Sequence, residues 1–229
     1  MLRPVPDAAQ LFIESSTPRA SLALLRGSTV LWEESFTGDR SHNALLFAPL
    51  ERALACLGAG ETLAEVVIGT GPGSYSGTRV GIAAGQGVAM VHGCPAVGLC
   101  SLLAVPAAES GNSLAIGDAR RGSAWRAVIQ DGVLVREPEL CTAAELEEEI
   151  RGMGEGKVFS LEEVGKIGLS EGSLGRVLLE RPDALRLAAA WGKLAEGERG
   201  RLSAMPPQPV YLRPPHITEA KGGHPLLRR

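Results

Sequence analysis

The chain has 229 residues, of which 45% are hydrophobic and 21% are charged, and its formal net charge is −3. This composition is typical of a globular protein with a sizeable core, and the mildly acidic charge argues against tight, non-specific binding to nucleic acid. No apolar run approaches the roughly 20 residues of a membrane span, the first ten residues do not resemble a signal peptide, and the cysteines show no CxxC spacing. We therefore expect a cytoplasmic protein with four reduced cysteines, Cys56, Cys94, Cys100 and Cys141.

The first 110 residues predict an α/β unit that begins with three strands joined by short turns. A helix follows, capped by Ser41 and kinked at Pro49, and then a buried strand, a glycine-rich loop and a second helix. A short strand and a last helix, capped by Ser101, complete the unit. The expected strands are 11–13, 20–25, 29–36, 65–70 and 95–98, and the expected helices are 42–57, 78–92 and 101–110.

The second half predicts a smaller unit with its own hairpins, although no repeat of fixed period relates it to the first. Asp131-Gly132 is a strong hairpin signal, and Thr142 with Glu145 predicts a capping box at a helix start. The expected strands are 113–117, 123–129, 133–140 and 158–160, the expected helices are 143–151 and 182–194, and residues 206–215 are proline-rich and extended. We therefore divide the chain into an N-terminal subdomain (1–110), a smaller C-terminal subdomain (111–205) and an extended tail (206–229).

The stretch 69–92 combines a glycine loop with a helix whose small residues recur every fourth position. The loop lacks the lysine of a P-loop and the spacing of a Rossmann fingerprint, so we do not expect a phosphate cradle. Gly77, Gly81, Gly85 and Ala89 leave one helix face almost without side chains, although each interior glycine costs about 1 kcal/mol relative to alanine. Because the preceding helix is apolar on more than one face, we interpret the pair of helices as a docking surface for another protein.

The candidate catalytic residues do not assemble into a recognisable site. Glu14 precedes hydroxyl residues at the end of the first strand, but it is a single carboxylate with no visible partner. Asp118 and Arg120 fall in a tight turn, where an internal ion pair explains them. Ser170 lies in a GxSxG sequence without the strand and helix that flank a nucleophile elbow, and the four histidines lack metal-binding spacing. We therefore predict no catalytic residue and no metal site.

Five segments of the chain, in order, resemble motifs of the TsaB (YeaZ) family. They are FIESST at 12–17, Ser41-His42 with Leu45-Leu46, GPGSYSGTRVG at 71–81, DARRG at 118–122 and PVYLR at 209–213. The resemblance covers residues 11–126 and 206–213, and the glycine-rich signature is its most specific part.

The resemblance implies the actin/Hsp70/sugar-kinase-like (ASKHA, RNase H-like) α/β fold, with two βββαβα subdomains of which the second is reduced here. It implies a catalytically inert scaffold subunit that activates TsaD, the protein that carries the transfer chemistry in the synthesis of tRNA N6-threonylcarbamoyladenosine. The other implied partners are a second copy of the chain, as a homodimer when it is alone, and TsaE as a candidate. The tRNA is reached only through the complex, no membrane is involved, and no cofactor is expected beyond weak or vestigial nucleotide binding.

The resemblance also assigns residues to two sites. The expected partner interface lies on helices 42–57 and 78–92 and comprises His42, Leu46, Leu50, Gly77, Arg79, Gly81, Gly85, Val88 and Ala89. A degenerate nucleotide site is expected at Glu14, Ser15, Thr17 and Asp118. Glu14 departs from the aspartate that is usual in the family, and Ser123 departs from a frequent glutamate; the first departure weakens any phosphate or metal role.

An ATP-dependent phosphotransferase of the same fold is the alternative function. Such an enzyme needs a second phosphate loop and a Gly-Gly turn for the adenosine, whereas the Gly-Gly pair of this sequence is Gly222-Gly223 in the tail. A glycopeptidase is a third alternative, and for that activity the sequence lacks a well-placed nucleophile or metal ligands.

Overall fold

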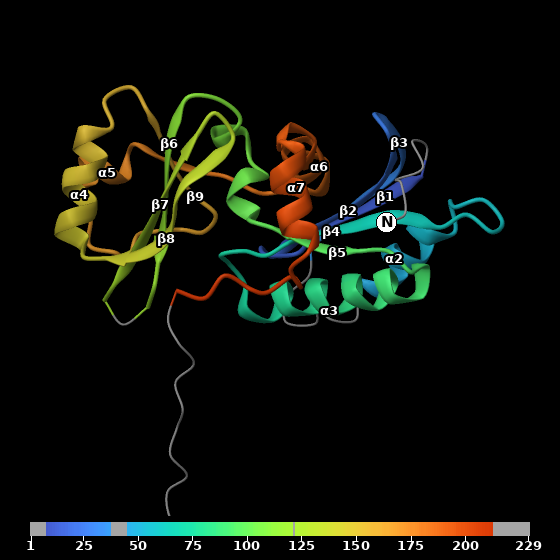
Figure 1. The fold of residues 1–229 in the computed structure, drawn as a ribbon. Helices are drawn as coiled ribbons and strands as arrows, with labels where there is room; N and C mark the ends of the chain where they lie inside the picture. The colour runs from blue at the N-terminus through green and yellow to red at the C-terminus, as the bar shows by residue number, and fades with distance from the viewer. Residues whose placement is uncertain (1–7, 38–44, 121, 213–229) are drawn as a thin grey trace, which may run out of the picture.

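The computed structural model describes residues 8–37, 45–120 and 122–212, which form two five-stranded sheets with helices between and around them (Figure 1). The first sheet has the strand order β3-β2-β1-β4-β5. Its strands are β1 (Ala9–Glu14), β2 (Arg19–Arg26), β3 (Thr29–Thr37), β4 (Leu63–Gly69) and β5 (Ala96–Leu99). β1 pairs antiparallel with β2 and parallel with β4, so the chain makes a meander first and then a crossover. β1 and β4 are covered on both faces, which explains their continuous apolar runs.

The second sheet repeats this topology in the order β10-β9-β6-β7-β8. Its strands are β6 (Asn112–Asp118), β7 (Ala124–Gln130), β8 (Val133–Cys141), β9 (Lys157–Ser160) and β10 (Val177–Leu179). β6 takes the place of β1, since it pairs antiparallel with β7 and parallel with β9. The fold is therefore ASKHA-like, with two related βββαβα halves, and the last two strands of the second half have only 4 and 3 residues.

The helices pack against the two sheets and form three hydrophobic cores. They are α2 (Phe47–Leu54), α3 (Tyr75–His92), α4 (Ala143–Gly152), α5 (Glu171–Leu174), α6 (Ala184–Lys193) and α7 (Glu196–Ser203), with 3-10 turns η1 (Ser101–Leu103) and η2 (Pro106–Ala108). α2 and α3 cover one face of the first sheet, α4 covers the outer face of the second, and α6 lies with the 3-10 turns between the two sheets (Figure 1). Among the described residues, no helix is long and apolar enough to cross a membrane.

The helices that follow the second sheet pack against the first one. α6 contacts β1, β2 and β4, and α7 contacts β5. The backbone N–H of Ala184 at the start of α6 donates to Ser21 Oγ of β2 over 2.8 Å. The predicted C-terminal subdomain (111–205) therefore includes helices whose packing belongs to the first sheet, because hydrophobic periodicity does not tell which sheet a helix covers. The boundaries at 110 and 205 stay a prediction.

Several local predictions are corrected. The predicted helix 101–110 is two 3-10 turns, since Pro106 has no N–H to continue a helix. In the described part of helix 42–57, Leu45 is helical, Leu46 is a turn and α2 follows. Pro49 is the third residue of α2, where a missing N–H costs little, so the interruption lies before α2 and not at Pro49. Ser170 caps the short helix α5. β10, α5 and α7 were not predicted, because their segments are short or polar.

Candidate functional site

The small-residue face of α3 packs against the sheet of its own chain. A Cβ atom added at Gly77 would lie 2.3 Å from the backbone oxygen of Ser15, and one added at Gly85 would lie 2.5 Å from Ile68 Cδ1. At Gly81 the nearest atom would be Ser15 Oγ, at 2.2 Å. The glycines therefore bring α3 within van der Waals contact of β1 and β4. The prediction that this face receives another protein is wrong: its bare surface is already covered.

Hydrogen bonds fix the start of α3 to the end of β1. Ser15 Oγ donates to the backbone oxygen of Gly77 over 2.9 Å, and the N–H of Ser74 donates to the oxygen of Ser16 over 2.6 Å. Ser74 is also the N-cap, because its Oγ accepts from the N–H of Gly77. The loop formed by residues 69–77, here called the glycine loop, thus sets the position of the helix.

The other predicted interface residues divide between the interior and the surface. Leu46, Leu50, Val88 and Ala89 are buried, with at most 8% exposed. Arg79 is half-buried and contacts aromatic rings at the N-terminal end of α3. His42 lies outside the described residues.

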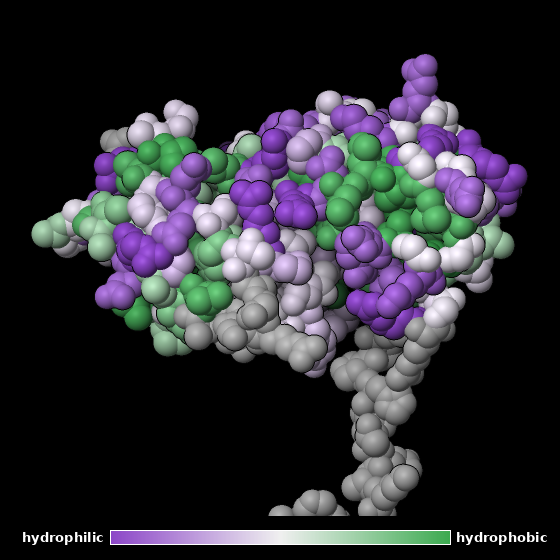
Figure 2. Space-filling view, turned by 180° about the vertical axis from the view of Figure 1, so that it is seen from behind, coloured by the Kyte–Doolittle hydropathy of each residue, from purple (hydrophilic) through white to green (hydrophobic). Residues whose placement is uncertain are grey.

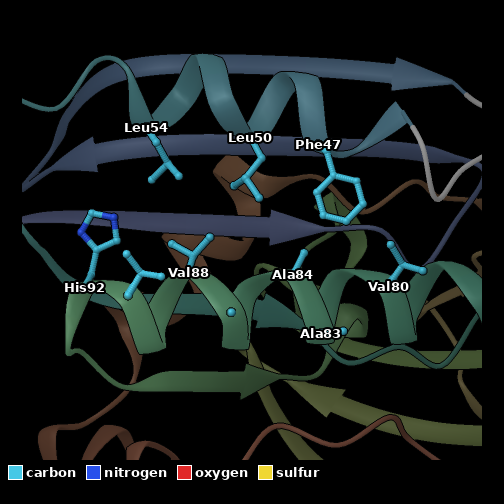
Figure 3. A pocket seen from close by; sticks show the side chains of 10 residues that line it. Phe47, Leu50, Leu54, Val80, Ala83, Ala84, Val88 and His92 are labelled. Carbon is cyan, nitrogen blue, oxygen red and sulfur yellow. The ribbon is translucent and has the colours of Figure 1, made fainter.

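An apolar groove lies between α2 and α3, on the side of both helices that faces away from the sheet (Figure 3). It has a volume of about 570 Å³. Side chains of α2 point across it toward small residues of α3 (Figure 3). We call it the α2–α3 groove, and it is lined by Phe47, Leu50, Leu54, Val80, Ala83, Ala84, Gly87, Val88, Val91 and His92.

The lining of the α2–α3 groove is accessible as well as apolar. Phe47 is 56% exposed and Val91 is 84% exposed, next to Met90 at 83%. Gly87 has open space where a Cβ would stand, in contrast to Gly85 two residues earlier. Apolar side chains exposed at this level are typical of interaction sites in soluble proteins.

Exposed apolar residues also occur elsewhere, so exposure alone does not select the groove. Seen from behind, hydrophobic residues form separate patches over both halves, with hydrophilic residues between them (Figure 2). Val133 and Val135 of the edge strand β8 and Leu178 and Leu179 of β10 are about half exposed. The α2–α3 groove differs from these because it is concave and has an almost wholly apolar lining.

A second cavity, of about 450 Å³, lies between the two sheets and is called the inter-sheet cleft. It is lined by Ser16, Thr17, Pro18, Pro72, Gly73, Ser74, Tyr75, Asp118, Ala119, Arg120, Trp125, Leu161, Glu162 and Leu212. The structure brings Thr17 and Asp118 of the predicted nucleotide site together here, whereas Glu14 and Ser15 do not line the cleft.

The charges of the inter-sheet cleft do not suit a phosphate. Among the described residues that line it, Arg120 is the one cation, and it pairs with Asp118 over 3.2 Å and with Glu162 over 3.4 Å. Two carboxylates against one guanidinium give these three side chains a formal net charge of −1, which does not favour an anionic ligand. Thr17 is also engaged, because its Oγ1 donates to the backbone oxygen of Arg19.

Glu14 turns into the protein instead of toward the inter-sheet cleft. It is fully buried, its Oε1 accepts from the N–H of Ser16 over 2.7 Å, and its Oε2 has no partner among the described residues. Burial is the main cause that raises the pKa of this carboxyl above its ordinary value, and the hydrogen bonds from Ser16 offset it only in part. A buried carboxyl whose surroundings favour its neutral form is a poor ligand for Mg²⁺. No group of three His, Cys, Asp or Glu residues that could hold a metal ion occurs in 8–37, 45–120 and 122–212.

The groove residues that the sequence interpretation missed form a second stripe on α3. Val80, Ala83, Gly87 and Val91 recur at spacings of three and four residues, as residues on one helix face do. This stripe lines the α2–α3 groove, beside the glycine face. The pattern was visible in the sequence, but nothing in it tells which of two small or apolar stripes is covered by the chain itself.

Comparisons with known proteins find matches to parts of the chain. A family model described as TsaD, tRNA N6-adenosine threonylcarbamoyltransferase, matches residues 36–141, which is less than half of the chain. An uncharacterized protein of Mycobacterium tuberculosis is 32% identical over 142 residues, which are 60% of this chain and 66% of that protein. The tRNA threonylcarbamoyladenosine biosynthesis protein TsaB of Bacillus subtilis is 30% identical over 124 residues, which are 52% of this chain and 54% of that protein.

The fold agrees with these sequence matches. YeaZ from Pseudomonas aeruginosa superimposes with a TM-score of 0.68 at 19% identity, and the match covers 90% of this chain and all of that one. A second Pseudomonas aeruginosa structure, described as similar to peptidase YEAZ, gives a TM-score of 0.65 at 20% identity with the same coverage. The sequence matches span slightly under two thirds of the mycobacterial protein and about half of the Bacillus protein.

Proposed function

The chain belongs to the TsaB (YeaZ) family, and on this premise we propose that it is a non-catalytic scaffold subunit in the synthesis of tRNA N6-threonylcarbamoyladenosine. In this proposal it binds and activates a TsaD homologue, which carries out the transfer, and it reaches tRNA only through that complex. A TsaE homologue is a further proposed partner, and a second copy of the chain is the proposed partner when TsaD is absent.

The α2–α3 groove is the observation that supports this proposal. Its walls are aliphatic and aromatic, and its floor at Ala83, Ala84 and Gly87 has almost no side chains. Such a groove fits the apolar face of a partner helix, which inserts large side chains where this chain has small ones. His92 is the one ionisable residue in the lining, so the fit depends on apolar contact rather than on charge. We therefore assign the docking surface to the outward faces of α2 and α3 in place of the glycine face.

The alternative, an ATP-dependent phosphotransferase, finds less support in the residues of the inter-sheet cleft. Its carboxylates outnumber its single guanidinium, and Glu14 is buried away from it. Isothermal titration calorimetry with Mg-ATP tests the alternative directly. The proposal expects no binding in the micromolar range; micromolar binding with turnover would favour the enzyme.

A copurification experiment with matched variants tests the proposal. The TsaD homologue of the same organism is expected to copurify with the wild-type chain and with Val135→Glu, which places a charge on an exposed valine of β8 away from the groove. Val91→Glu places the same charge on an exposed residue of the α2–α3 groove and should abolish copurification. Retention of the TsaD homologue by both variants would refute the groove as its docking surface. Size-exclusion chromatography of the same proteins alone reports whether a homodimer uses this surface.

A further inference from the structure

We propose that residues 206–212 form a strap that ties the glycine loop to the second sheet beside the inter-sheet cleft. The inference concerns a device within this chain and does not depend on the partner proposed above. The segment leaves α7, passes the N-terminal end of α3 and ends beside the second sheet (Figure 1).

The strap is attached first to the edge of the first sheet. The N–H of Val210 donates to the backbone oxygen of Thr70 over 2.9 Å, at the point where β4 passes into the glycine loop. Pro207 is buried against β5, and a Cβ added at Gly98 would lie only 3.2 Å from the Pro207 Cα. Gly98 therefore permits the close approach of the strap to the sheet.

A cation held between two aromatic rings makes the second attachment. The Arg79 guanidinium lies 3.3 Å from the ring centroid of Tyr75 and 5.2 Å from that of Tyr211. Its Nη2 donates to Tyr211 Oη over 3.0 Å, and its Nη1 donates to the backbone oxygen of Tyr75 over 2.8 Å. Within the described residues Arg79 has no carboxylate within salt-bridge distance, so its charge is satisfied by the rings, the hydroxyl and the carbonyl. Arg79, which was predicted to lie in the partner interface, thus contacts Tyr211 of the strap.

The end of the strap reaches the other half of the molecule. Leu212 is half-buried against the core between the sheets and lines the inter-sheet cleft with Trp125 of β7 and Leu161 after β9. One strap of seven residues therefore contacts β5, the glycine loop, α3 and the second sheet.

The strap supplies a contact between the two halves of the molecule beside the inter-sheet cleft. In this fold class a cleft between two related halves is the expected place for a ligand that contacts both. Here Asp118, Glu162 and Arg120 have a formal net charge of −1, which does not favour an anionic ligand. Apolar contact by Leu212 is compatible with that charge.

Hydrogen–deuterium exchange of the full chain tests the strap. The double variant Tyr211→Ala/Leu212→Ser removes both distal attachments but keeps the Val210 hydrogen bond. Arg79→Ala removes the cation from the other side. In both, backbone amides of residues 70–78 and 117–120 should exchange about 5 to 30 times faster, the factor expected when one stacked, hydrogen-bonded contact is lost. Amides of α4, which is remote from the strap, should be unchanged.

A matched substitution distinguishes the loss of the strap contacts from a general destabilisation of the fold. Leu178→Ser alters a leucine of β10 that is 48% exposed and should leave exchange at 70–78 unchanged. The proposal is overturned if both strap variants leave exchange at 70–78 and 117–120 as in the wild type, or if exchange rises equally in α4. If the double variant does not fold, Arg79→Ala decides between these outcomes, because it leaves the strap sequence intact.

Discussion

The packing of α3 makes a sharp prediction about two glycines that are two residues apart. Gly85 and Gly87 both lie in the interior of the same helix, so replacement by alanine gives each the same intrinsic gain, about 1 kcal/mol. Their surroundings differ. A Cβ at Gly85 would stand 2.5 Å from Ile68 Cδ1 and 2.7 Å from Ile68 Cγ1, whereas a Cβ at Gly87 meets nothing within 4 Å.

The difference in unfolding free energy between the two variants is therefore the cost of overpacking at Gly85. Ile68 is fully buried in a close-packed core, so relief requires a shift of its side chain or of the helix. Such shifts typically cost about 1–3 kcal/mol. At roughly 2–4 °C per kcal/mol for a chain of this length, the unfolding midpoint of Gly85→Ala should lie about 2–12 °C below that of Gly87→Ala.

Thermal unfolding followed by circular dichroism measures this difference directly. Gly87→Ala should unfold at or above the wild-type midpoint and serves as the control for helix propensity. If Gly85→Ala proves as stable as Gly87→Ala, the glycine face of α3 does not lie against β4. In that case the docking surface would have to be reassigned to the glycine face.

Two further predictions concern buried ionisable groups. Because the folded-state pKa of Glu14 is raised, the wild type loses stability as pH rises from the ordinary pKa of 4.5 toward the folded-state pKa. Glu14→Gln cannot ionise and does not lose this stability. In denaturant titrations, the stability of Glu14→Gln relative to the wild type should therefore increase with pH. A relative stability that does not change with pH would contradict a raised folded-state pKa of Glu14. Burial raises the pKa of Cys100 to about 12 and that of Cys141 to about 11, so iodoacetamide at pH 8 should label the exposed Cys56 first and these two only after unfolding. Rapid labelling of Cys100 in the native protein, detected by mass spectrometry, would contradict its position.

The sequence predicted those features that depend on local signals. The capping box of Thr142 and Glu145 is present, and the hairpin at Asp131-Gly132 joins β7 to β8. The apolar runs of β1 and β4 lie where a parallel pair should, with Phe12 opposite Val67. These signals act within a few residues of the chain, so one sequence suffices to find them.

These local signals do not predict which face of a helix packs against the chain's own sheets. Gly81 and Gly85 require a close neighbour, but the requirement is equally met by β1 and β4 or by another protein. The same holds for α6, whose amphipathic pattern does not tell that it packs against the first sheet, and for Arg79, whose second ring, Tyr211, lies 132 residues further along the chain. Contacts between residues far apart in the sequence decide each of these cases, and the local periodicity of the sequence does not predict such contacts.

The most direct test of the docking surface is the affinity of the TsaD homologue for two arginine variants. Gly87→Arg places its side chain in the α2–α3 groove from a position where an added Cβ meets no atom within 4 Å, so the fold should be kept. Gly200→Arg makes the same change at an open glycine of α7, outside the groove. Isothermal titration calorimetry should show Gly200→Arg binding as the wild type does and Gly87→Arg at least about tenfold more weakly, a loss of about 1.4 kcal/mol. Equal affinity of the two folded variants would contradict the account.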